Sequence, residues 1–458
     1  MTEPASPESR FKKPVRVVID GREIIAEAGA PLLQVALDNG IEIPHYCYHP
    51  KLSIDGSCRM CQVKVEKAPK LQIACNTPCA DGMVVDTRAD EVVDARKGVM
   101  ELLLVNHPLD CPICDQAGEC YLQDYSFGHG RSESRTTSPR RKGLKRYPIG
   151  PRVVFDQERC ILCRRCVRFT HEISKTDELR VFGAGDRSHI ATSKDRPLDN
   201  PYSINVADVC PVGALLSADF HHKRRVWFLE ETETVCPTCS NGCNVKIGAF
   251  RNRIERLVPR RNDEVNDTWM CDHGRLNYEF VQDETRLREA AITGREPREA
   301  LRVSGLIDYT RDSDGNEVRP SGPTVDEAIA AAAASLRAGV ATWGEKAVAV
   351  VLTPTLTNEE TLLLARLVRE DLKTPHFALA VPLGLSDDFL IKPEKVANAR
   401  GARDLGVGPG DGGKDLAGIL AACASGEIKV LWVIGSDGLV AAAGLDAVEA
   451  AVANLEAL

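Results

Sequence analysis

The chain contains 458 residues, of which 43% are hydrophobic and 27% are charged, and its formal net charge is −8. At about 150 residues per domain, this length predicts roughly three domains. The negative charge argues against a general nucleic-acid binder. No apolar run approaches the roughly 18 residues that a membrane-spanning helix needs, and the segment MTEPASPESRFKKP has no apolar signal-peptide core. We therefore expect a soluble intracellular protein without a membrane span.

Short hydrophobic runs mark the first elements. Residues 15–26 form two β-rich runs around Asp20 and Gly21, a pattern that predicts a hairpin. A helix is expected over residues 31–39, and a loop region is expected from Cys47 to Cys79. A second helix is expected over residues 91–105, which leads the chain to His107.

The later part of the chain changes in character. Residues 131–146 are basic and rich in turn formers, which fits either a solvated loop or a partner-docking surface. From about residue 286 the sequence indicates an α/β domain, with buried strands at 347–352 and 429–434. Between them, a capping box at Thr357 to Glu360 opens a helix that runs to about residue 372. Because the chain ends soon after the second strand, we expect this domain to be partial.

Cysteine usage is unusual. The chain has 17 cysteines, and only Cys423 falls in the last 187 residues. In a reducing compartment, dense and closely spaced cysteines indicate metal binding rather than disulfides. We expect Cys423 to be a small buried hydrophobic residue.

The first set of candidate ligands comprises Cys47, Cys58, Cys61 and Cys75. A close thiolate pair with two distant partners suits a [2Fe–2S] cluster, although the first gap is longer than in plant-type ferredoxins. Cys79 competes with Cys75, which we prefer. Zinc is the alternative metal, but zinc sites favour two close pairs.

The second set comprises His107, Cys111, Cys114 and Cys120. A [4Fe–4S] cluster needs four protein ligands, and His107 lies close enough in sequence to be the fourth. An imidazole in place of a thiolate makes a cluster less negative, which raises its reduction potential. A three-cysteine zinc site beside a histidine is the alternative.

The third set comprises Cys160, Cys163, Cys166 and Cys210. Its first three members have the spacing of the bacterial [4Fe–4S] run, and Cys210 is followed by the proline typical of the fourth ligand. In that run a cysteine would follow at position 170, where this chain has threonine. Cys210 therefore completes the set from a distance.

The fourth set comprises Cys236, Cys239, Cys243 and Cys271. We expect a third [4Fe–4S] cluster here, with zinc as the alternative. No metalloprotease, nucleophile-elbow or Walker A motif accompanies the sets. The glycine-rich segment 406–410 follows no predicted strand and contains a proline, so it is expected to be a loop. The sets therefore indicate a relay of single electrons, with any flavin on another chain.

The order of these four sets resembles that of the large iron–sulfur subunit of bacterial respiratory complex I, NADH–quinone oxidoreductase. The resemblance is strong through residue 285 and looser beyond. It is carried by the segments IPHYCYHP, GSCRMCQV, HPLDCPICDQAGECYLQD and ERCILCRRCVRF. It implies a subunit of a proton-translocating oxidoreductase that has no complete active site of its own.

The resemblance also implies an α+β multidomain fold. Its expected parts are a ferredoxin-like [2Fe–2S] domain, iron–sulfur cluster domains and a partial α/β domain of the molybdopterin-oxidoreductase type. The [2Fe–2S] domain is expected at residues 14–92. The cluster domains are expected at residues 93–132, 150–228 and 229–285, and the α/β domain at residues 286–458. The last domain is expected to keep its fold without binding a molybdopterin.

The family places such a subunit in the peripheral arm, on the cytoplasmic side of the bacterial inner membrane. Its expected partners are a flavin-bearing, NADH-binding subunit and the quinone-proximal subunits. The first three clusters would then lie on the route from flavin to quinone, and the fourth off it. Mitochondrial members lack the fourth set, so its presence favours a bacterial protein.

Three other classes of protein compete with this interpretation. An NAD-linked formate dehydrogenase shares the N-terminal arrangement but needs a metal ligand in its α/β domain, and the surroundings of Cys423 match no such site. An iron hydrogenase needs further cysteines for its active cluster. A zinc scaffold would be colourless, whereas iron–sulfur proteins are brown.

The four sets predict the iron content of the anaerobically loaded chain. One two-iron and three four-iron clusters give about fourteen iron atoms per chain, with an equal amount of acid-labile sulfide. Chemical assays of both elements check this number. A value near ten iron atoms per chain would mean that one four-iron cluster is absent. The fourth set would then be the first to be doubted.

Overall fold

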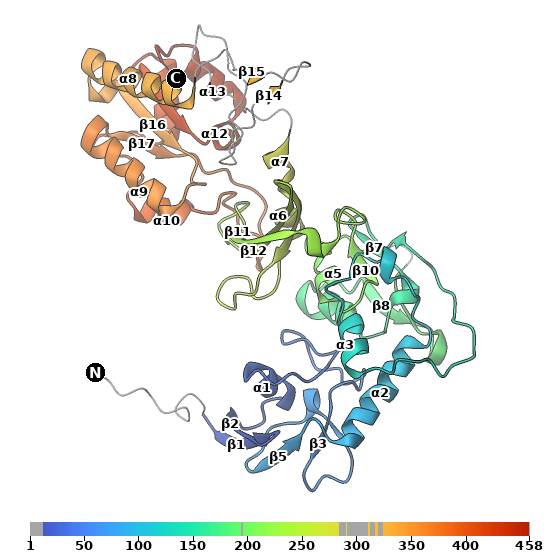
Figure 1. Cartoon of the computed structure of the whole chain (residues 1–458). Coiled ribbons are helices and arrows are strands. Elements are labelled where there is room, and N and C mark those ends of the chain that lie inside the picture. Colours follow the sequence, from blue (N-terminus) through green and yellow to red (C-terminus); the bar gives the residue numbers. More distant parts are fainter. Residues whose placement is uncertain are drawn as a thin grey trace. The chain divides into compact units, whose positions relative to one another are not determined.

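The computed structural model describes residues 12–193, 196–283, 290, 310–311, 317–318 and 324–457. The chain divides into two compact units, Met1–Glu230 and Glu231–Leu458 (Figure 1). Residues 1–11, and the boundary expected near residue 286, lie outside the described residues.

The N-terminal unit begins with the expected hairpin. Strands β1 (Pro14–Ile19) and β2 (Arg22–Glu27) pair antiparallel. The two residues between them, Asp20 and Gly21, both have positive φ angles, as the tight hairpin turns require. Helix α1 (Leu32–Asp38) follows, in agreement with the sequence.

The region from Cys47 to Cys79 is not only a loop, and that expectation was wrong. It contains β3 (Gln62–Val65) and β4 (Gln72–Ile73), which join a five-stranded sheet of order β2-β1-β5-β3-β4. The segment QVKV is too short for its period-two pattern to stand out in the sequence. Its other neighbour in the sheet is β5 (Met83–Asp86), and Val63, which pairs with Gln72 of β4, lies in the buried core.

Helices and short strands make up the rest of this unit. Helix α2 (Asp90–Leu104) agrees with the expected helix within one residue, and α3 (Tyr121–His129) follows the second set. Residues 131–146 form no helix or strand. The remaining elements are β6 (Tyr147–Pro148), β7 (Val153–Phe155), α4 (Arg165–Arg168), β8 (Leu179–Phe182), β9 (His189–Thr192), α5 (Asn205–Val209) and β10 (Leu215–Ser217).

The C-terminal unit begins with an antiparallel sheet. Its strands are β11 (Glu230–Val235), β12 (Asn244–Phe250) and β13 (Arg253–Pro259), in that order. The short helices α6 (Asp272–Leu276) and α7 (Glu279–Gln282) follow. Strands β14 (Thr310–Arg311) and β15 (Glu317–Val318) form a separate antiparallel pair.

A parallel sheet forms the centre of the remaining α/β part. Its described strands lie in the order β17 (His376–Leu379), β16 (Val348–Leu352) and β18 (Val430–Ile434). The sequence indicated two of these strands, and β17 was missed. Hydrophobic clusters cover both faces of the sheet, and the fully buried Cys423 lies in one of them.

Helices flank this sheet. They are α8 (Val325–Trp343), α9 (Asn358–Arg366), α10 (Ala399–Asp404), α11 (Leu416–Ala424), α12 (Ser436–Ala443) and α13 (Leu445–Val452). The expected capping box of Thr357 and Glu360 is present at the start of α9, and a π-helical turn continues that helix to Leu372. Residues 406–410 follow α10 rather than a strand, which confirms the expected loop.

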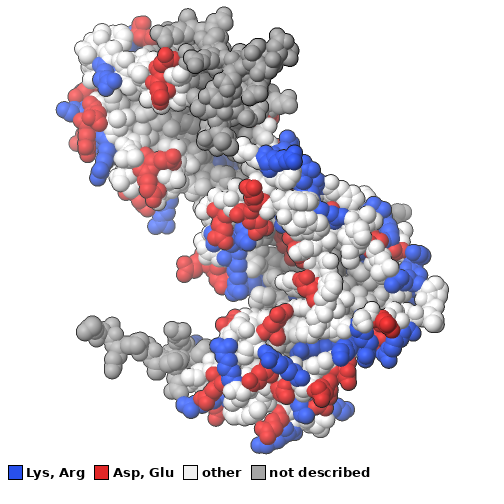
Figure 2. Space-filling model, viewed as in Figure 1, with Lys and Arg blue, Asp and Glu red and all other residues white. Residues whose placement is uncertain are grey.

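Acidic and basic side chains are interspersed over the visible faces of both units (Figure 2). Among the described residues, no helix is both long and apolar enough to cross a membrane.

Two glycines in helices predict opposite effects on stability. A Cβ at Gly339 of α8 would lie 2.6 Å from the side chain of buried Val430, whereas one at Gly98 of α2 would meet nothing within 4 Å. Gly339→Ala should therefore lower the free energy of unfolding of its unit by about 1–3 kcal/mol through overpacking. Gly98→Ala should raise that of its own unit by about 0.5–1 kcal/mol.

Hydrogen exchange of the sheet amides measures the free energy of unfolding of each unit separately. Equal effects of the two substitutions would contradict the close packing of α8 on β18.

Candidate metal centres

All 17 cysteines are free thiols, and the first set converges within the N-terminal sheet domain. Hydrogen bonds with Cys58 and Cys75 lower the pKa of the Cys47 thiol, and Cys61 is likewise bonded to Cys75. These contacts place the four sulfurs side by side. Burial alone raises the pKa of Cys79 to about 11. The contacts therefore favour Cys75 over Cys79 as a ligand.

The second set lies between the end of α2 and the start of α3. Cys111 and Cys114 are close enough to Cys120 for their charges to raise the pKa of its thiol, which burial brings to about 11. His107 lines a cavity of about 740 Å³ together with Cys111 and Cys120. Burial and the nearby Arg159 lower the pKa of His107 to about 4, so its ring is neutral at pH 7. A neutral imidazole is the form that binds metals.

The third set lies in an apolar pocket of the N-terminal unit. Its four cysteines line one small pocket, closed by apolar side chains that include Phe155 and Ile190. Burial raises the pKa of all four thiols, that of Cys163 to about 11, and the sulfurs also repel one another as thiolates. Such thiols stay protonated at pH 7 unless a metal replaces the proton.

The fourth set lies in the C-terminal unit. Cys236 begins the turn between β11 and β12, where Cys239 and Cys243 also lie, and Cys271 precedes α6. Burial raises the pKa of Cys243 to about 12, and each of the other three sulfurs raises it further. The Cys239 thiol contacts the Leu390 carbonyl at 3.9 Å, and the Ser240 amide donates to the Glu394 carbonyl at 2.9 Å. This set is therefore attached to the α/β part.

Two glycines provide the space that the sulfurs occupy. A Cβ at Gly213 would lie 2.1 Å from the Cys114 sulfur, which no real side chain could tolerate. A Cβ at Gly274 would lie 3.0 Å from the sulfur of Cys236 and 3.3 Å from that of Cys271. Buried, converging soft donors with cleared space beside them fit the iron–sulfur clusters expected from the sequence.

Arginines from α4 connect the first and third sets. Arg168 donates hydrogen bonds to the carbonyls of Cys47 and Cys163, the latter at 3.4 Å. Arg165 is 5% exposed and donates to the carbonyls of Tyr48 and Val209, the latter at 3.3 Å. The peptide segments that carry these two sets are therefore in direct contact through charged donors.

The second and third sets also touch. The Pro211 carbonyl, next to Cys210, accepts from the Tyr121 amide at 3.1 Å and contacts the Cys120 thiol at 3.9 Å. Arg159, which precedes Cys160 and is 1% exposed, pairs with Asp110 at 3.0 Å. An ion pair with a buried arginine thus joins residues adjacent to ligands of both sets.

Tyr46 lies between the first and second sets. Its ring is fully buried, and both Cys58 and Cys120 are close enough to raise the pKa of its hydroxyl, although burial is the larger cause. The hydroxyl donates to the Met100 sulfur at 3.2 Å. The three sets of this unit are therefore neighbours of one another.

Sequence reasoning missed the bridging arginines Arg159, Arg165 and Arg168, of which the first two are buried. The available signal was the concentration of arginines within and beside the third cysteine run. Their role became visible only because their carbonyl and carboxylate partners come from distant segments.

Family comparisons define the class of protein. A "2Fe-2S iron-sulfur cluster binding domain" matches residues 12–90, and a "Molybdopterin oxidoreductase Fe4S4 domain" matches residues 229–283. Between them, an "NADH-ubiquinone oxidoreductase-G iron-sulfur binding region" matches residues 96–135, and the "NADH-quinone oxidoreductase subunit 3, ferredoxin-like domain" matches residues 150–216. The chain is thus a multi-domain iron–sulfur protein with [2Fe–2S] and [4Fe–4S] binding domains.

Through these domains the chain is similar to the G subunits of NADH–quinone oxidoreductase. It is 40% identical over 268 residues to the G subunit of Rickettsia bellii, a match that covers 58% of this chain and 39% of the relative. It is 39% identical over 284 residues to the G subunit of Streptomyces coelicolor, a match that covers 62% of this chain and 34% of the relative. The matches thus span less than half the length of these relatives.

Among solved structures, a chain of the NAD⁺-reducing [NiFe]-hydrogenase in the H2-reduced state is 26% identical. The match covers 46% of this chain and 91% of that chain, with a TM-score of 0.42.

The space beside Cys114 predicts a selective loss of one cluster. Gly213→Ala should displace the Cys114 sulfur and cost the loaded chain about four iron atoms, because a four-iron cluster needs all of its ligands. Gly128→Ala is the matched control, since a Cβ there meets nothing within 4 Å. Iron analysis and EPR of the reduced chains compare the two variants. Full iron content in Gly213→Ala would show that Cys114 does not hold a cluster in this position.

Proposed function

We propose that this chain relays electrons within an NADH–quinone oxidoreductase, from a flavin on a partner subunit towards quinone, in a complex that couples this transfer to proton translocation. The proposal rests on the similarity of the iron–sulfur domains to those of NADH–quinone oxidoreductase subunits and on the convergence of the four candidate sets. When bound, the clusters would supply one-electron redox chemistry at protein-tuned potentials.

The ligands are proposed residue by residue. The first set would hold one [2Fe–2S] cluster, and the other three sets would each hold one [4Fe–4S] cluster. His107 would be the single nitrogen ligand, which its neutral, partly buried ring supports. No molybdopterin is expected in the α/β part.

The observation that carries the proposal is the contact between sets in the N-terminal unit. Hydrogen bonds from Arg165 and Arg168 join the first set to the third, and the Pro211 carbonyl joins the second to the third. A relay needs clusters held at short and constant separations. Hydrogen bonds between the ligand-bearing segments provide that constraint, and the arginines would also stabilise negatively charged clusters.

The fourth set is proposed to lie off this path and to act mainly in stability. Its cysteines connect two segments of the C-terminal unit, and Leu390 and Glu394 attach it to the α/β part. A cluster bound there would favour the folded state that presents its four ligands.

Partner subunits are proposed to cover the second set. Leu102, Leu109 and Phe127 line its cavity with side chains that are 76%, 80% and 87% exposed. Exposed apolar side chains grouped in this way are typical of protein–protein contacts. The partners would be the flavin-bearing and quinone-proximal subunits, on the cytoplasmic side of a bacterial inner membrane.

The domain boundaries remain proposals of the same kind. Residues 14–92, 93–132, 150–228, 229–285 and 286–458 are proposed as domains in that order. The residues matched by the four family models support the first four.

Two cysteine substitutions test the path. In the assembled complex, Cys163→Ala should lower NADH–quinone activity per flavin by roughly a hundredfold or more, because loss of a direct ligand exceeds the usual effect of an outer-shell change. Cys271→Ala should lower the yield of assembled complex more than its activity per flavin. Cys423→Ala is the control, since this thiol lies in the α/β core.

Equal losses of activity per flavin in Cys163→Ala and Cys271→Ala would place the fourth cluster on the path. Full activity in Cys163→Ala, with its four iron atoms missing, would refute the relay itself.

A further inference from the structure

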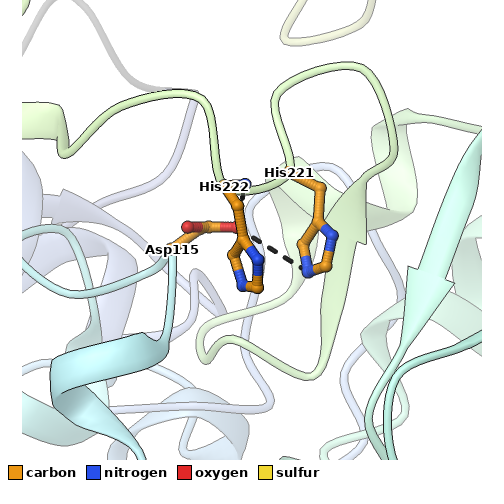
Figure 3. A group of neighbouring side chains, drawn as sticks. All are labelled: Asp115, His221 and His222. Atoms are coloured by element: carbon orange, nitrogen blue, oxygen red, sulfur yellow. Dashed lines mark hydrogen bonds and ion pairs between the residues drawn. The ribbon is translucent and has the colours of Figure 1, made fainter.

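Three side chains outside the four sets form a separate cluster of metal-binding groups. Asp115 follows Cys114, whereas His221 and His222 lie beyond β10 (Figure 3). One ligand atom from each residue lies within 4.8 Å of the other two. The cluster belongs entirely to the N-terminal unit.

The three groups are arranged around the Asp115 carboxylate, which is 6% exposed. Its Oδ2 atom accepts a hydrogen bond from the His222 backbone amide at 2.9 Å and lies 3.9 Å from Nε2 of His221. The two imidazole rings stack with their centroids 3.9 Å apart and an interplanar angle of 22° (Figure 3). The backbone hydrogen bond thus holds the peptide segment of both histidines beside the carboxylate.

One ring nitrogen in this cluster is left without a partner. Nε2 of His221 is buried and makes no hydrogen bond among the described residues. Its 3.9 Å separation from Oδ2 is too long for one. Leaving a buried polar atom unsatisfied is costly, and such atoms in native structures call for a missing ion or water. The atom is directed at the carboxylate, where an ion between them would satisfy both.

We propose that Asp115, His221 and His222 bind one divalent transition-metal ion, with Zn²⁺ as the preferred ion. Two imidazoles and one carboxylate are a common protein ligand set for zinc, with a fourth position open to water. Donors of a tetrahedral zinc site at about 2.0–2.1 Å lie roughly 3.4 Å apart. In the structure the ligand atoms lie up to 4.8 Å apart, and rotation of the exposed His222 ring can bring its nitrogen to the shorter separation.

The donor atoms select the class of metal. Arg146 and Arg159 oppose a positive charge at His221 whereas Asp115 favours one, and this balance is the same for every divalent ion. Hard cations such as Mg²⁺ and Ca²⁺ bind through charge and prefer oxygen ligands, so this site does not suit them. Zn²⁺ and its neighbours gain more from imidazole nitrogen and tolerate this environment.

A metal here would connect two segments that carry ligands of different sets. Asp115 is the neighbour of Cys114 in the second set, and His221 and His222 follow β10, which comes shortly after Cys210 of the third set. Arg225 donates to the Cys114 carbonyl at 2.6 Å and so already joins the same two segments. The ion would strengthen this junction without taking part in electron transfer.

The test measures zinc binding to the full chain with its clusters loaded, under anaerobic conditions and at equal iron content in every preparation. Zinc per chain is determined by elemental analysis after dialysis against a weak chelator, and affinity by calorimetry with Zn²⁺. The wild type should bind one zinc ion more than the double variant His221→Ala/His222→Ala. His222→Ala alone should weaken binding by roughly tenfold to a hundredfold or more, since a ligand is lost.

His171→Ala is the matched control, because that histidine is exposed and pairs with Asp177 away from the cluster. It should bind zinc as the wild type does. Equal zinc content in the wild type and the double variant, whether one ion or none, would overturn the proposal. It would then leave Asp115 as a carboxylate that only accepts the His222 amide. This outcome is independent of NADH–quinone activity, so it leaves the proposed function untouched.

Discussion

The structure depends on gathering soft ligands from distant parts of the chain at buried points. Burial raises the pKa of most of these thiols, so most of them are unfavourable to ionise until a metal replaces the protons. The surrounding fold must therefore present the sulfurs in place and clear the space around them. Gly213 and Gly274, beside the sulfurs of two different sets, meet that steric requirement.

The negative charge that a cluster would bring to a buried site explains the arginines that bridge the sets. Arg159 is paired with Asp110, whereas Arg165 and Arg168 direct their donors at backbone carbonyls in the ligand-bearing segments. A guanidinium held in this way keeps its charge and directs it at the site. The same donors fix neighbouring sets relative to each other, so one kind of side chain serves both electrostatics and spacing.

The two units apply the same ligand chemistry in different settings. In the N-terminal unit three sets adjoin one another through shared peptide contacts. In the C-terminal unit the fourth set is held between a small antiparallel sheet and segments around Leu390 and Glu394 of the α/β part. This difference in setting is what supports a relay for the first three and a stabilising role for the fourth.

Local signals in the sequence determined the elements that depend on neighbouring residues: the hairpin at Asp20, the capping box at Thr357, the strand at 430–434 and the short-range cysteine spacings. Contacts between residues that are distant in the sequence were harder to predict from it. The arginine bridges, the cluster of Asp115 with His221 and His222, and the contacts that favour Cys75 over Cys79 were decided by tertiary structure alone. Turns, caps and periodicity depend on residues that are neighbours in the sequence. These contacts join atoms from separate segments, and only the folded path of the chain sets their distances.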